Sequence, residues 1–264
     1  MNTKLNNAGL RARTLSLAVA AATAAMAGTA SAEEWNWGVT PYVWTTDLGM
    51  SLSVADRDLI DTEIAFDDLV EKVDDAAMVR VEGMRGHHGM SFDLFNVELA
   101  DSPAASLPNA PSTLLNLDLG VGMTILDATG VYDLNGADEW FSLLYGARVI
   151  ELRNDVDAIL SDGGFAIGTR SFDSTDRFVD GLVGFRFARE LPHNLAYEVH
   201  VDVSTGDTEL TWSAGPTVSY RFGDGQQYEV KAGYRLMDIN FETSEPVEAD
   251  MSMSGLSVGF RINF

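Results

Sequence analysis

Apolar and polar residues alternate with period two along most of the chain after residue 32. The last run shows this most clearly, with apolar Leu256, Val258, Phe260, Ile262 and Phe264 separated by Ser257, Gly259, Arg261 and Asn263. Because side chains alternate across a strand, each such run predicts a strand with one apolar and one polar face. The pattern predicts ten strands, at residues 35–46, 76–86, 89–100, 113–126, 139–153, 177–189, 194–204, 208–222, 226–240 and 251–264.

Two architectures share this pattern. A soluble sandwich buries the apolar faces between two sheets, whereas a transmembrane barrel turns them to lipid and turns the polar faces to its lumen. The polar faces here carry both signs of charge, the chain ends on a strand, and aromatic residues gather near strand ends. Those aromatic residues are Trp35, Trp37, Trp44, Trp140, Tyr220, Phe222, Tyr228 and Phe264. We therefore predict an all-β fold, an antiparallel transmembrane β-barrel of about ten strands, with eight or twelve as alternatives.

The alternation also assigns residues to the two faces of each strand. In the first run, Trp37, Val39, Pro41 and Val43 are expected to point outward, and Thr40, Tyr42 and Trp44 inward. In the run at 113–126, the outward set is Leu115, Leu117, Leu119, Val121, Met123 and Ile125, and the inward set is Asn116, Asp118, Gly120, Gly122 and Thr124. Inward charged residues are then nearly balanced. The basic ones are Arg80, Arg148, Arg186, Arg221, Lys231, Arg235 and Arg261, and the acidic ones are Glu82, Asp93, Asp118, Asp180, Glu198, Asp202, Glu209 and Glu229. Such pairing predicts a plugged or very narrow lumen.

The connections between strands suggest which end is which. Both chain ends are expected on the periplasmic side, with short turns there and longer segments at 47–75, 101–112, 154–176 and 241–250 outside. Two connections depart from this rule: a long inner turn at 127–138 and a short outer one at 204–208. In segment 47–75, residues 51–54 and 60–66 can pair as a hairpin, and residues 67–74 can form a short amphipathic helix. If the hairpin crossed the membrane the barrel would have twelve strands; we expect it in the outer loop or over the mouth.

The first 32 residues have the form of an export signal. Lys4, Arg11 and Arg13 precede an apolar stretch at 15–28, which ends near Ala30-Ser31-Ala32. This predicts a secretory signal peptide over residues 1–32, cleaved near Ala32, since the stretch is too short and alanine-rich to span about 30 Å of hydrocarbon well. Residues 33–264 then form the barrel domain. An exported chain without cysteine fits the envelope of a Gram-negative bacterium.

Composition excludes several classes of protein. The chain has 40 acidic and 17 basic residues, a net charge of −23, and no cysteine. The charge argues against nucleic-acid binding, and the lack of cysteine excludes disulfide scaffolds, zinc–thiolate sites and cysteine nucleophiles. Segments 47–75, 154–176 and 241–250 together hold 19 acids and 3 bases, a charge of −16. We interpret them as a solvated, repulsive surface; divalent-cation binding is the alternative.

The first strand and the chain end resemble a known family. Pro41-Tyr42-Val43-Trp44, then Leu48-Gly49, Ala65-Phe66-Asp67-Asp68-Leu69, Glu82, Gly86–Gly89 and Asp93 follow its pattern. The chain resembles a family of small, poorly characterised proteobacterial outer-membrane β-barrels, similar in general architecture to OmpW- and OmpX-like proteins. The final Phe264 resembles the C-terminal signal that the barrel-assembly machinery reads. The resemblance implies the fold and the location, and the family offers no known reaction.

Candidate chemistry is sparse. The chain has no P-loop, no G-x-S-x-G and no H-E-x-x-H motif. His87-His88 lies in a glycine-flanked turn and His193 in another, which favours polar turns over a metal site. His200 lies on an inward face between Glu198 and Asp202; a general base is possible there, although a lumen ion-pair network is the commoner role. We assign no catalytic, metal-binding or cofactor-binding residue.

We therefore expect a non-enzymatic outer-membrane protein with a structural, binding or minor solute-passage role. Two alternatives remain: a lipid-modifying enzyme, a hydrolase or acyltransferase with His200 or a loop carboxylate as base, and a narrow, cation-preferring pore. The expected partners are outer-membrane lipids, lipopolysaccharide and, through Phe264, the assembly machinery. No nucleic acid and no cofactor are expected.

Overall fold

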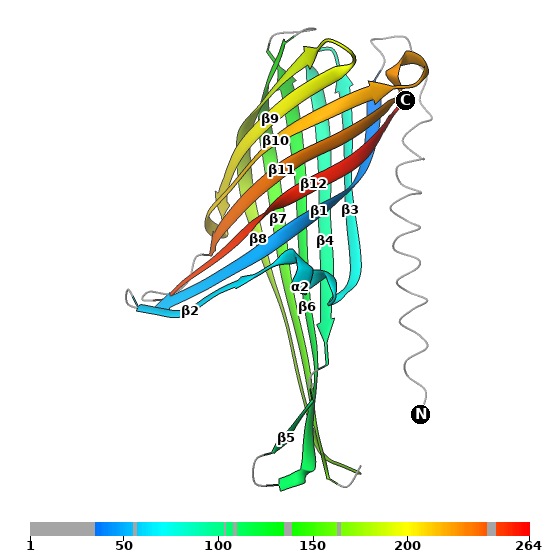
Figure 1. Ribbon diagram of the computed structural model, residues 1–264. Coiled ribbons are helices and arrows are strands. Elements are labelled where there is room, and N and C mark those ends of the chain that lie inside the picture. The colour runs from blue at the N-terminus through cyan, green and yellow to red at the C-terminus, as the bar shows by residue number, and fades with distance from the viewer. Residues whose placement is uncertain are drawn as a thin grey trace. The chain divides into compact units, whose positions relative to one another are not determined.

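The computed structural model describes residues 35–54, 57–102, 104–107, 110–134, 139–162, 165–241 and 247–264. The expected signal peptide and its cleavage site at Ala32 lie outside this part of the chain. Within it, no helix is both long enough and apolar enough to cross a membrane. The described chain is almost entirely strand (Figure 1).

Ten antiparallel strands form a closed barrel, as predicted. They are β1 (Asn36–Val54), β3 (Val73–Arg85), β4 (His88–Asp101), β6 (Ala110–Asp133), β7 (Glu139–Asp162), β8 (Phe165–Leu191), β9 (Leu195–Gly206), β10 (Thr208–Phe222), β11 (Tyr228–Phe241) and β12 (Val247–Asn263). Each pairs with its neighbour in chain order, and β12 pairs with β1 to close the ring. Two further strands stay outside the ring: β2 (Arg57–Ile64) pairs with β1, and β5 (Ala104–Leu107) pairs with β6.

The barrel has two unlike ends. At the first, which we call the short-turn end, tight turns join β3 to β4, β8 to β9, and β10 to β11 through η1 (Asp224–Gln226). Gly86 and Gly223 have φ of 57° and 85° in two of these turns, a conformation that glycine adopts without a steric penalty. Trp37 and Phe264 exchange backbone hydrogen bonds at this end, which places the start of β1 beside the end of the chain.

At the opposite end, which we call the extended end, the strands continue as two flaps (Figure 1). One flap consists of β5 and the long strands β6, β7 and β8, and the other of β2, β1, β12 and β11. The predicted loops at 101–112 and 154–176 are therefore largely strand, because their residues continue the β4, β6, β7 and β8 ladders. The predicted long turn at 127–138 was also wrong: β6 continues to Asp133.

The ambiguous segment 47–75 resolves into a hairpin and a helix at the extended end. β1 runs on to Val54 and pairs with β2, while α2 (Phe66–Val70) follows and buries Leu69. The carboxylate of Asp47 accepts a 2.8 Å hydrogen bond from the backbone N–H of Phe66. Since β2 pairs with β1 alone among the ring strands, the hairpin adds no strand to the barrel, and the ten-strand prediction is confirmed.

The predicted faces are confirmed on β1 and β12 and inverted on β6. Val43 and Leu256 are exposed, whereas Trp44 is buried. On β6, however, Ile125 is buried inside the ring and Leu126 is exposed, so the odd-numbered residues face inward. The prediction was wrong because it assigned the apolar side of residues 113–126 to the outside, whereas at this level of the barrel the apolar side faces inward, in line with buried Asp127 and Val131 on the same strand.

Candidate functional site in the barrel lumen

The lumen begins at the short-turn end with a polar vestibule. It is a cavity of about 480 Å³, and nine of the ten ring strands, all except β4, contribute lining residues to it. Its charged walls include Glu82, Arg186, Arg221, Glu229 and Arg261. A cavity of this volume accommodates a small molecule or a cluster of waters. The vestibule is therefore large compared with the cavities of about 60 and 50 Å³ deeper in the described lumen.

Arginine–carboxylate pairs form the charged walls of the vestibule. Arg186 Nη1 lies 2.6 Å from Glu82 Oε2, and Arg261 Nη1 lies 3.5 Å from the other oxygen of the same carboxylate. Arg221 pairs with Glu190 and lies 3.9 Å from Glu229. Since the two oxygens of Glu82 accept separate cations, the carboxylate is held between two strands.

A second tier of charge centres on Asp93. Its carboxylate pairs with Arg80 at 2.7 Å and with Arg235 at 3.5 Å, and accepts a 2.9 Å hydrogen bond from the Tyr42 hydroxyl. Lys231 lies 3.8 Å from Glu198 in the same region. Buried charges are costly unless they are paired, and every inward cation in the sequence prediction has a carboxylate partner here.

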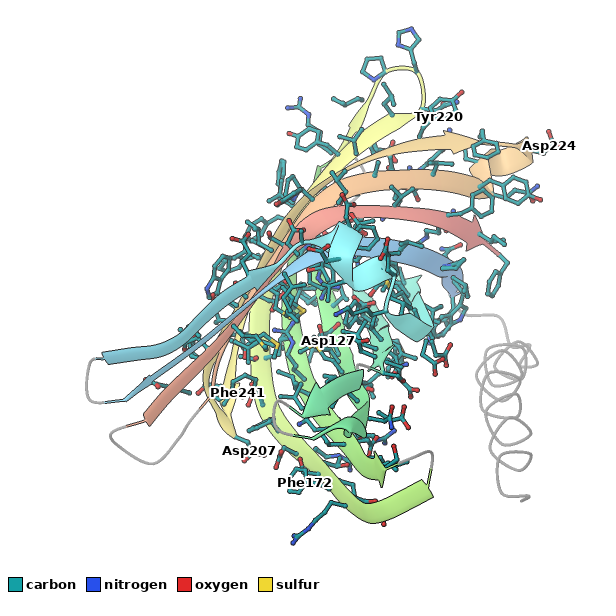
Figure 2. The ribbon with its side chains drawn as sticks, turned by 60° about the horizontal axis from the view of Figure 1, so that its bottom comes forward. Asp127, Phe172, Asp207, Tyr220, Asp224 and Phe241 are labelled. Carbon is teal, nitrogen blue, oxygen red and sulfur yellow. The ribbon has the colours of Figure 1, made fainter. Side chains whose placement is uncertain are left out.

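Arg148 is the most deeply buried of the charged residues in the described lumen. Its guanidinium is fully buried and forms a bidentate pair with Asp127, at 2.7 and 2.9 Å, and a third contact of 2.9 Å with Asp202. Figure 2 shows Asp127 inside the ring. Because bidentate charge-assisted pairs fix geometry as well as energy, Arg148 ties β6, β7 and β9 together.

Two of these pairs cross the lumen. β3, which carries Glu82, is separated from β8, which carries Arg186, by β4, β6 and β7 on one side and by the rest of the ring on the other. Asp93 on β4 and Arg235 on β11 are separated in the same way by β3, β1 and β12. An arginine that reaches a carboxylate on the far wall closes the space between them. The described cavities at this level are only about 60 and 50 Å³.

His200 lies within this constriction. It faces the lumen, as predicted, and its Nε2 lies 3.3 Å from Ser213 Oγ on the neighbouring strand. Glu198 and Asp202, its predicted companions, pair instead with Lys231 and Arg148. A serine next to a histidine is the minimum for nucleophilic chemistry, but here both belong to a narrow, ion-paired region.

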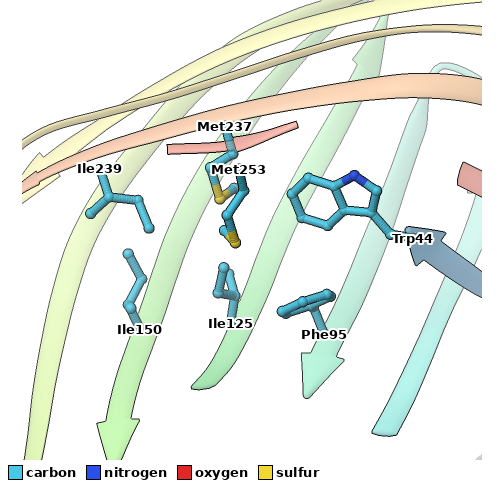
Figure 3. Close-up of a cluster of buried hydrophobic side chains, with 7 residues drawn as sticks. All are labelled: Trp44, Phe95, Ile125, Ile150, Met237, Ile239 and Met253. Atoms are coloured by element: carbon cyan, nitrogen blue, oxygen red, sulfur yellow. The ribbon is translucent and has the colours of Figure 1, made fainter. Parts of the chain in front are cut away.

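An apolar layer closes the lumen toward the extended end (Figure 3). Seven buried side chains form it: Trp44, Phe95, Ile125, Ile150, Met237, Ile239 and Met253. The Trp44 and Phe95 rings meet edge to face at 5.3 Å, and the Arg235 guanidinium lies 4.7 Å from the Trp44 ring centre. The layer therefore packs directly on the charged tier, and its members come from β1, β4, β6, β7, β11 and β12.

Some sequence assignments to the lumen were wrong. Asp118 is exposed and accepts a hydrogen bond from Ser102, because β6 has the opposite face inward. Glu209 is exposed beside a register shift in β10, which displaces it from the inward row. Asp127 was missed because the sequence placed it in a turn. The available signal was the alternation around Ile125 and Leu126: if Ile125 faces inward, Asp127, two residues later, does so too.

The other histidines lie where the sequence placed them. His87 is in the turn, with Nδ1 2.9 Å from the Asp133 carbonyl oxygen, and the His88 ring lies 5.1 Å from the Tyr132 ring. His193 is in the turn between β8 and β9 with a φ of 67°. Across the described residues, no group of three or more histidine, aspartate or glutamate side chains is arranged to hold a metal ion.

Aromatic side chains gather at the short-turn end. Trp35 stacks on Trp37 at 5.4 Å, and Phe222 contacts Tyr220, Tyr228 and Phe260 at ring distances of 5.6–6.3 Å. Trp44, which the sequence grouped with them, instead lies in the apolar layer. The cluster has the composition of an interfacial aromatic girdle.

Comparisons with known proteins found similar solved structures but no match in sequence. No family model matches the chain, and no curated protein matches it in sequence. Among solved structures, the outer membrane protease OmpT from Escherichia coli is similar at 9% identity, with a TM-score of 0.47, over 90% of this chain and 99% of that one. Ail, the attachment invasion locus protein of Yersinia pestis, is 11% identical, with a TM-score of 0.34, over 88% and 100%. Neisserial surface protein A is 16% identical, with a TM-score of 0.29, over 88% and 100%.

Proposed function

We propose that this chain is an integral protein of the Gram-negative outer membrane, a closed barrel with a structural or binding role rather than an open pore. Two ion pairs that cross the lumen carry the proposal: Arg186 with Glu82, and Arg235 with Asp93. The short-turn end then faces the periplasm, and the two flaps extend outside the cell.

The outward face supports insertion in a membrane. Exposed apolar side chains continue around the ring strands, and on β12 they run from Phe264 to Leu256. Eight steps of about 3.3 Å, tilted by about 40°, give a band roughly 20 Å tall. This approaches the apolar band of about 25 Å that outer-membrane barrels present to lipid.

Planar-bilayer recording on refolded protein tests the closed-barrel proposal. We expect no large, sustained conductance, because ions would have to pass the paired charges and then the apolar layer. Any residual current should favour cations, since the segments assigned to the outside carry a charge of −16. That preference should weaken in about 1 M salt, where the Debye length is about 3 Å. A large, stable, anion-selective conductance would contradict both the plugged lumen and the orientation.

We also propose that the barrel is not an enzyme. The one arrangement that favours the alternative, a lipid hydrolase or acyltransferase, is His200 Nε2 beside Ser213 Oγ. Analysis of phospholipids and lipid A in cells that overproduce either the native chain or His200→Ala distinguishes a lipid-modifying enzyme from a protein without enzymatic activity. We expect identical lipid profiles; a modified lipid that needs His200 would establish an enzyme.

Assembly provides a further test. We propose that the barrel-assembly machinery recognises the outward row of β12 that ends at Phe264. Deleting Phe264, or changing it to Asp, should strand the protein in the periplasm, while Asn263→Ala, one position earlier, should insert normally. Fractionation of the envelope measures this. Normal outer-membrane amounts of the deletion variant would show that the row is not needed.

A further inference from the structure

We propose that the apolar layer of the lumen holds an acyl chain of an outer-leaflet lipid, which reaches it through an opening in the barrel wall between β1 and β3. The inference rests on the proposed membrane insertion and gives the binding role a ligand class. Four observations carry it: the pairing of β1, the height of the opening, the character of the lining, and an unpartnered indole N–H.

The hydrogen-bonded wall is interrupted where β1 leaves β3, and we call this interruption the opening. Their ladder runs from Asn36 opposite Met84 to Pro41 opposite Val79 and stops. β1 then continues with β12 along its other edge, and only from Leu48 does it pair with β2. Residues 42–47 of β1 and 73–78 of β3 have no ladder pair with each other, although the structure describes all of them. Figure 1 shows the two strands diverging toward α2.

A methionine occupies the start of this opening. The backbone N–H of Trp44 points to Met78 and donates to its Sδ at 3.2 Å, where a β3 carbonyl would otherwise accept. At the far side of the opening, α2 is held against β1 by the hydrogen bond from Phe66 to Asp47. A thioether on a flexible, unbranched side chain is easily moved. The opening is therefore bounded by a firm ladder below, a helix above and a movable side chain between them.

The opening lies at the rim of the outward apolar band. On the outward row of β1 the last exposed apolar residue is Val43, and on that of β12 it is Leu256; the next outward residues are Thr45 and Ser254. The unpaired residues 42–47 begin at this level. In a membrane, this is the boundary between acyl chains and headgroups of the outer leaflet. A lipid molecule beside the barrel thus meets the opening with the upper part of its chains.

The lining behind the opening suits a flexible hydrocarbon. Met237 and Met253 belong to the apolar layer, and Met78, Met123 and Met251 pack against it, five of the ten methionines in the chain. Methionine adapts to irregular ligands because it has three rotatable bonds and a polarizable sulfur. The paired charges beneath give the layer a polar floor, so a chain would end there rather than cross the barrel.

Trp44 supplies the polar contact that an acyl chain requires. Its side chain is 1% exposed, and its Nε1 has no hydrogen-bond acceptor among the described residues. A buried indole N–H normally finds a partner, because leaving it unpaired costs free energy. The carbonyl oxygen of an acyl ester or amide is such an acceptor. This favours an acylated lipid over a plain hydrocarbon.

Photocrosslinking in vesicles tests the inference. The protein is refolded into phosphatidylethanolamine carrying a diazirine on one acyl chain, irradiated, and its adducts are mapped by mass spectrometry. Neighbouring residues on β11 and β12 provide the internal reference, since Met237 and Met253 face the lumen whereas Leu236 and Leu256 face outward. We expect adducts on both pairs. Adducts on Leu236 and Leu256 alone would overturn the inference while supporting membrane insertion, and adducts on neither would refute the insertion itself.

Variants separate occupancy of the layer from mere proximity. Met253→Trp fills the layer and should abolish the adduct on Met237 while those on the outward residues remain; Leu256→Trp, outward on the same strand, should leave it unchanged. Trp44→Phe removes the N–H and should lower the inward yield about fivefold, the loss expected for one hydrogen bond. The mobility shift of unheated samples on a gel reports folding, and Ile239→Phe is a milder filling variant if Met253→Trp does not fold. An undiminished Met237 adduct in a folded filling variant would overturn the inference.

Discussion

Two halves of one strand, β7, follow opposite rules. Toward the short-turn end, Tyr145 is 53% exposed on the outside while Arg148 is completely buried inside. Beyond Val149 the polarity changes: Ile150 is completely buried inside, and outward Glu151 pairs with outward Arg153. Inward and outward residues of β7 continue to alternate with a period of two through this point. The apolar side chains, however, change from the outward to the inward face.

The same inversion occurs around the ring at one level. Inward residues change from charged to apolar between Asp93 and Phe95, Asp127 and Ile125, Asp180 and Phe178, and Arg235 and Met237. A strand in lipid must turn its apolar side outward, whereas a barrel wall in water must turn it inward. In the membrane-spanning barrel that we propose, the inversion marks the level at which the wall passes from lipid to water. On that proposal, it gives the upper limit of the membrane.

The largest effect should come from placing a charge in the apolar layer. Ile150→Asp removes a fully buried side chain and leaves a carboxylate without a partner, so we expect a loss of about 5 kcal/mol of unfolding free energy. Its neighbour Glu151→Ala removes a partly exposed ion pair with Arg177 and should cost less than about 1 kcal/mol. Urea unfolding in lipid vesicles measures both. If Glu151→Ala were the more damaging change, the assigned inversion on β7 would be wrong.

In the charged half, removing a cation should be nearly as harmful. Arg148→Ala leaves Asp127 and Asp202 buried and unpaired, at a cost of about 3–5 kcal/mol. Replacing all three together, as Arg148→Met with Asp127→Asn and Asp202→Asn, removes the unpaired charge and should recover part of that loss. The same unfolding experiment compares them. A triple variant less stable than Arg148→Ala would show that the pairing itself, and not the avoidance of unpaired charge, stabilises this half.

The outward band gives a third comparison. Val218→Arg places a cation on the lipid-facing side of β10 near the middle of the strand, with an expected cost of about 2–4 kcal/mol. Thr217 is the neighbouring residue and faces inward, so Thr217→Arg should destabilise the fold less, because it does not expose a cation to lipid. Unfolding in vesicles and in a detergent micelle distinguishes a lipid effect from a packing effect. Equal losses for the two variants would reject the assignment of faces on β10.

The ring could be predicted because alternation and turn residues are local signals. The ten strands, the ten-strand ring and the short turns with Gly86 and Gly223 followed from residue patterns alone. The level at which the apolar face changes sides could not be predicted, because apolar and polar residues alternate with a period of two both above and below it. The predicted faces of β6 are inverted for this reason: Met123 and Ile125 are apolar and inward, whereas an apolar face toward lipid predicts that they point outward.

The site was less predictable than the fold. Alternation placed Glu82, Asp93, Arg186 and Arg235 in the lumen, but it could not pair residues across the ring, because partners such as Arg235 and Asp93 are 142 positions apart. The apolar layer and the open wall depend on where β1 stops pairing with β3. That point is set by the divergence of β1 from β3 in the folded barrel, and residue spacing along either strand does not reveal it.

The smallest effect should come from an exposed ion pair near the extended end. Lys72 Nζ lies 2.9 Å from Asp101 Oδ2, and both side chains are about half exposed. The hydrogen bond from Lys72 holds the pKa of Asp101 below its usual range and raises the pKa of Lys72. A lowered carboxylate pKa stabilises the fold above the unfolded value, near 4, and the benefit is lost as pH falls through the folded value. The raised lysine pKa acts below about 10.4 and is lost as pH rises through the folded value.

Lys72→Ala should therefore destabilise the fold only slightly at neutral pH, and less than any change above, because solvent screens exposed pairs. The difference from the native chain should shrink as the pH falls below about 4 and in about 1 M salt. Urea midpoints for the two chains, measured across pH and at two ionic strengths, provide the check. The buried pair of Arg148 is shielded from salt, so the stability lost in Arg148→Ala should persist at high ionic strength. If salt erased both losses alike, water would have to reach Arg148, and the contrast between the exposed and buried pairs would fail.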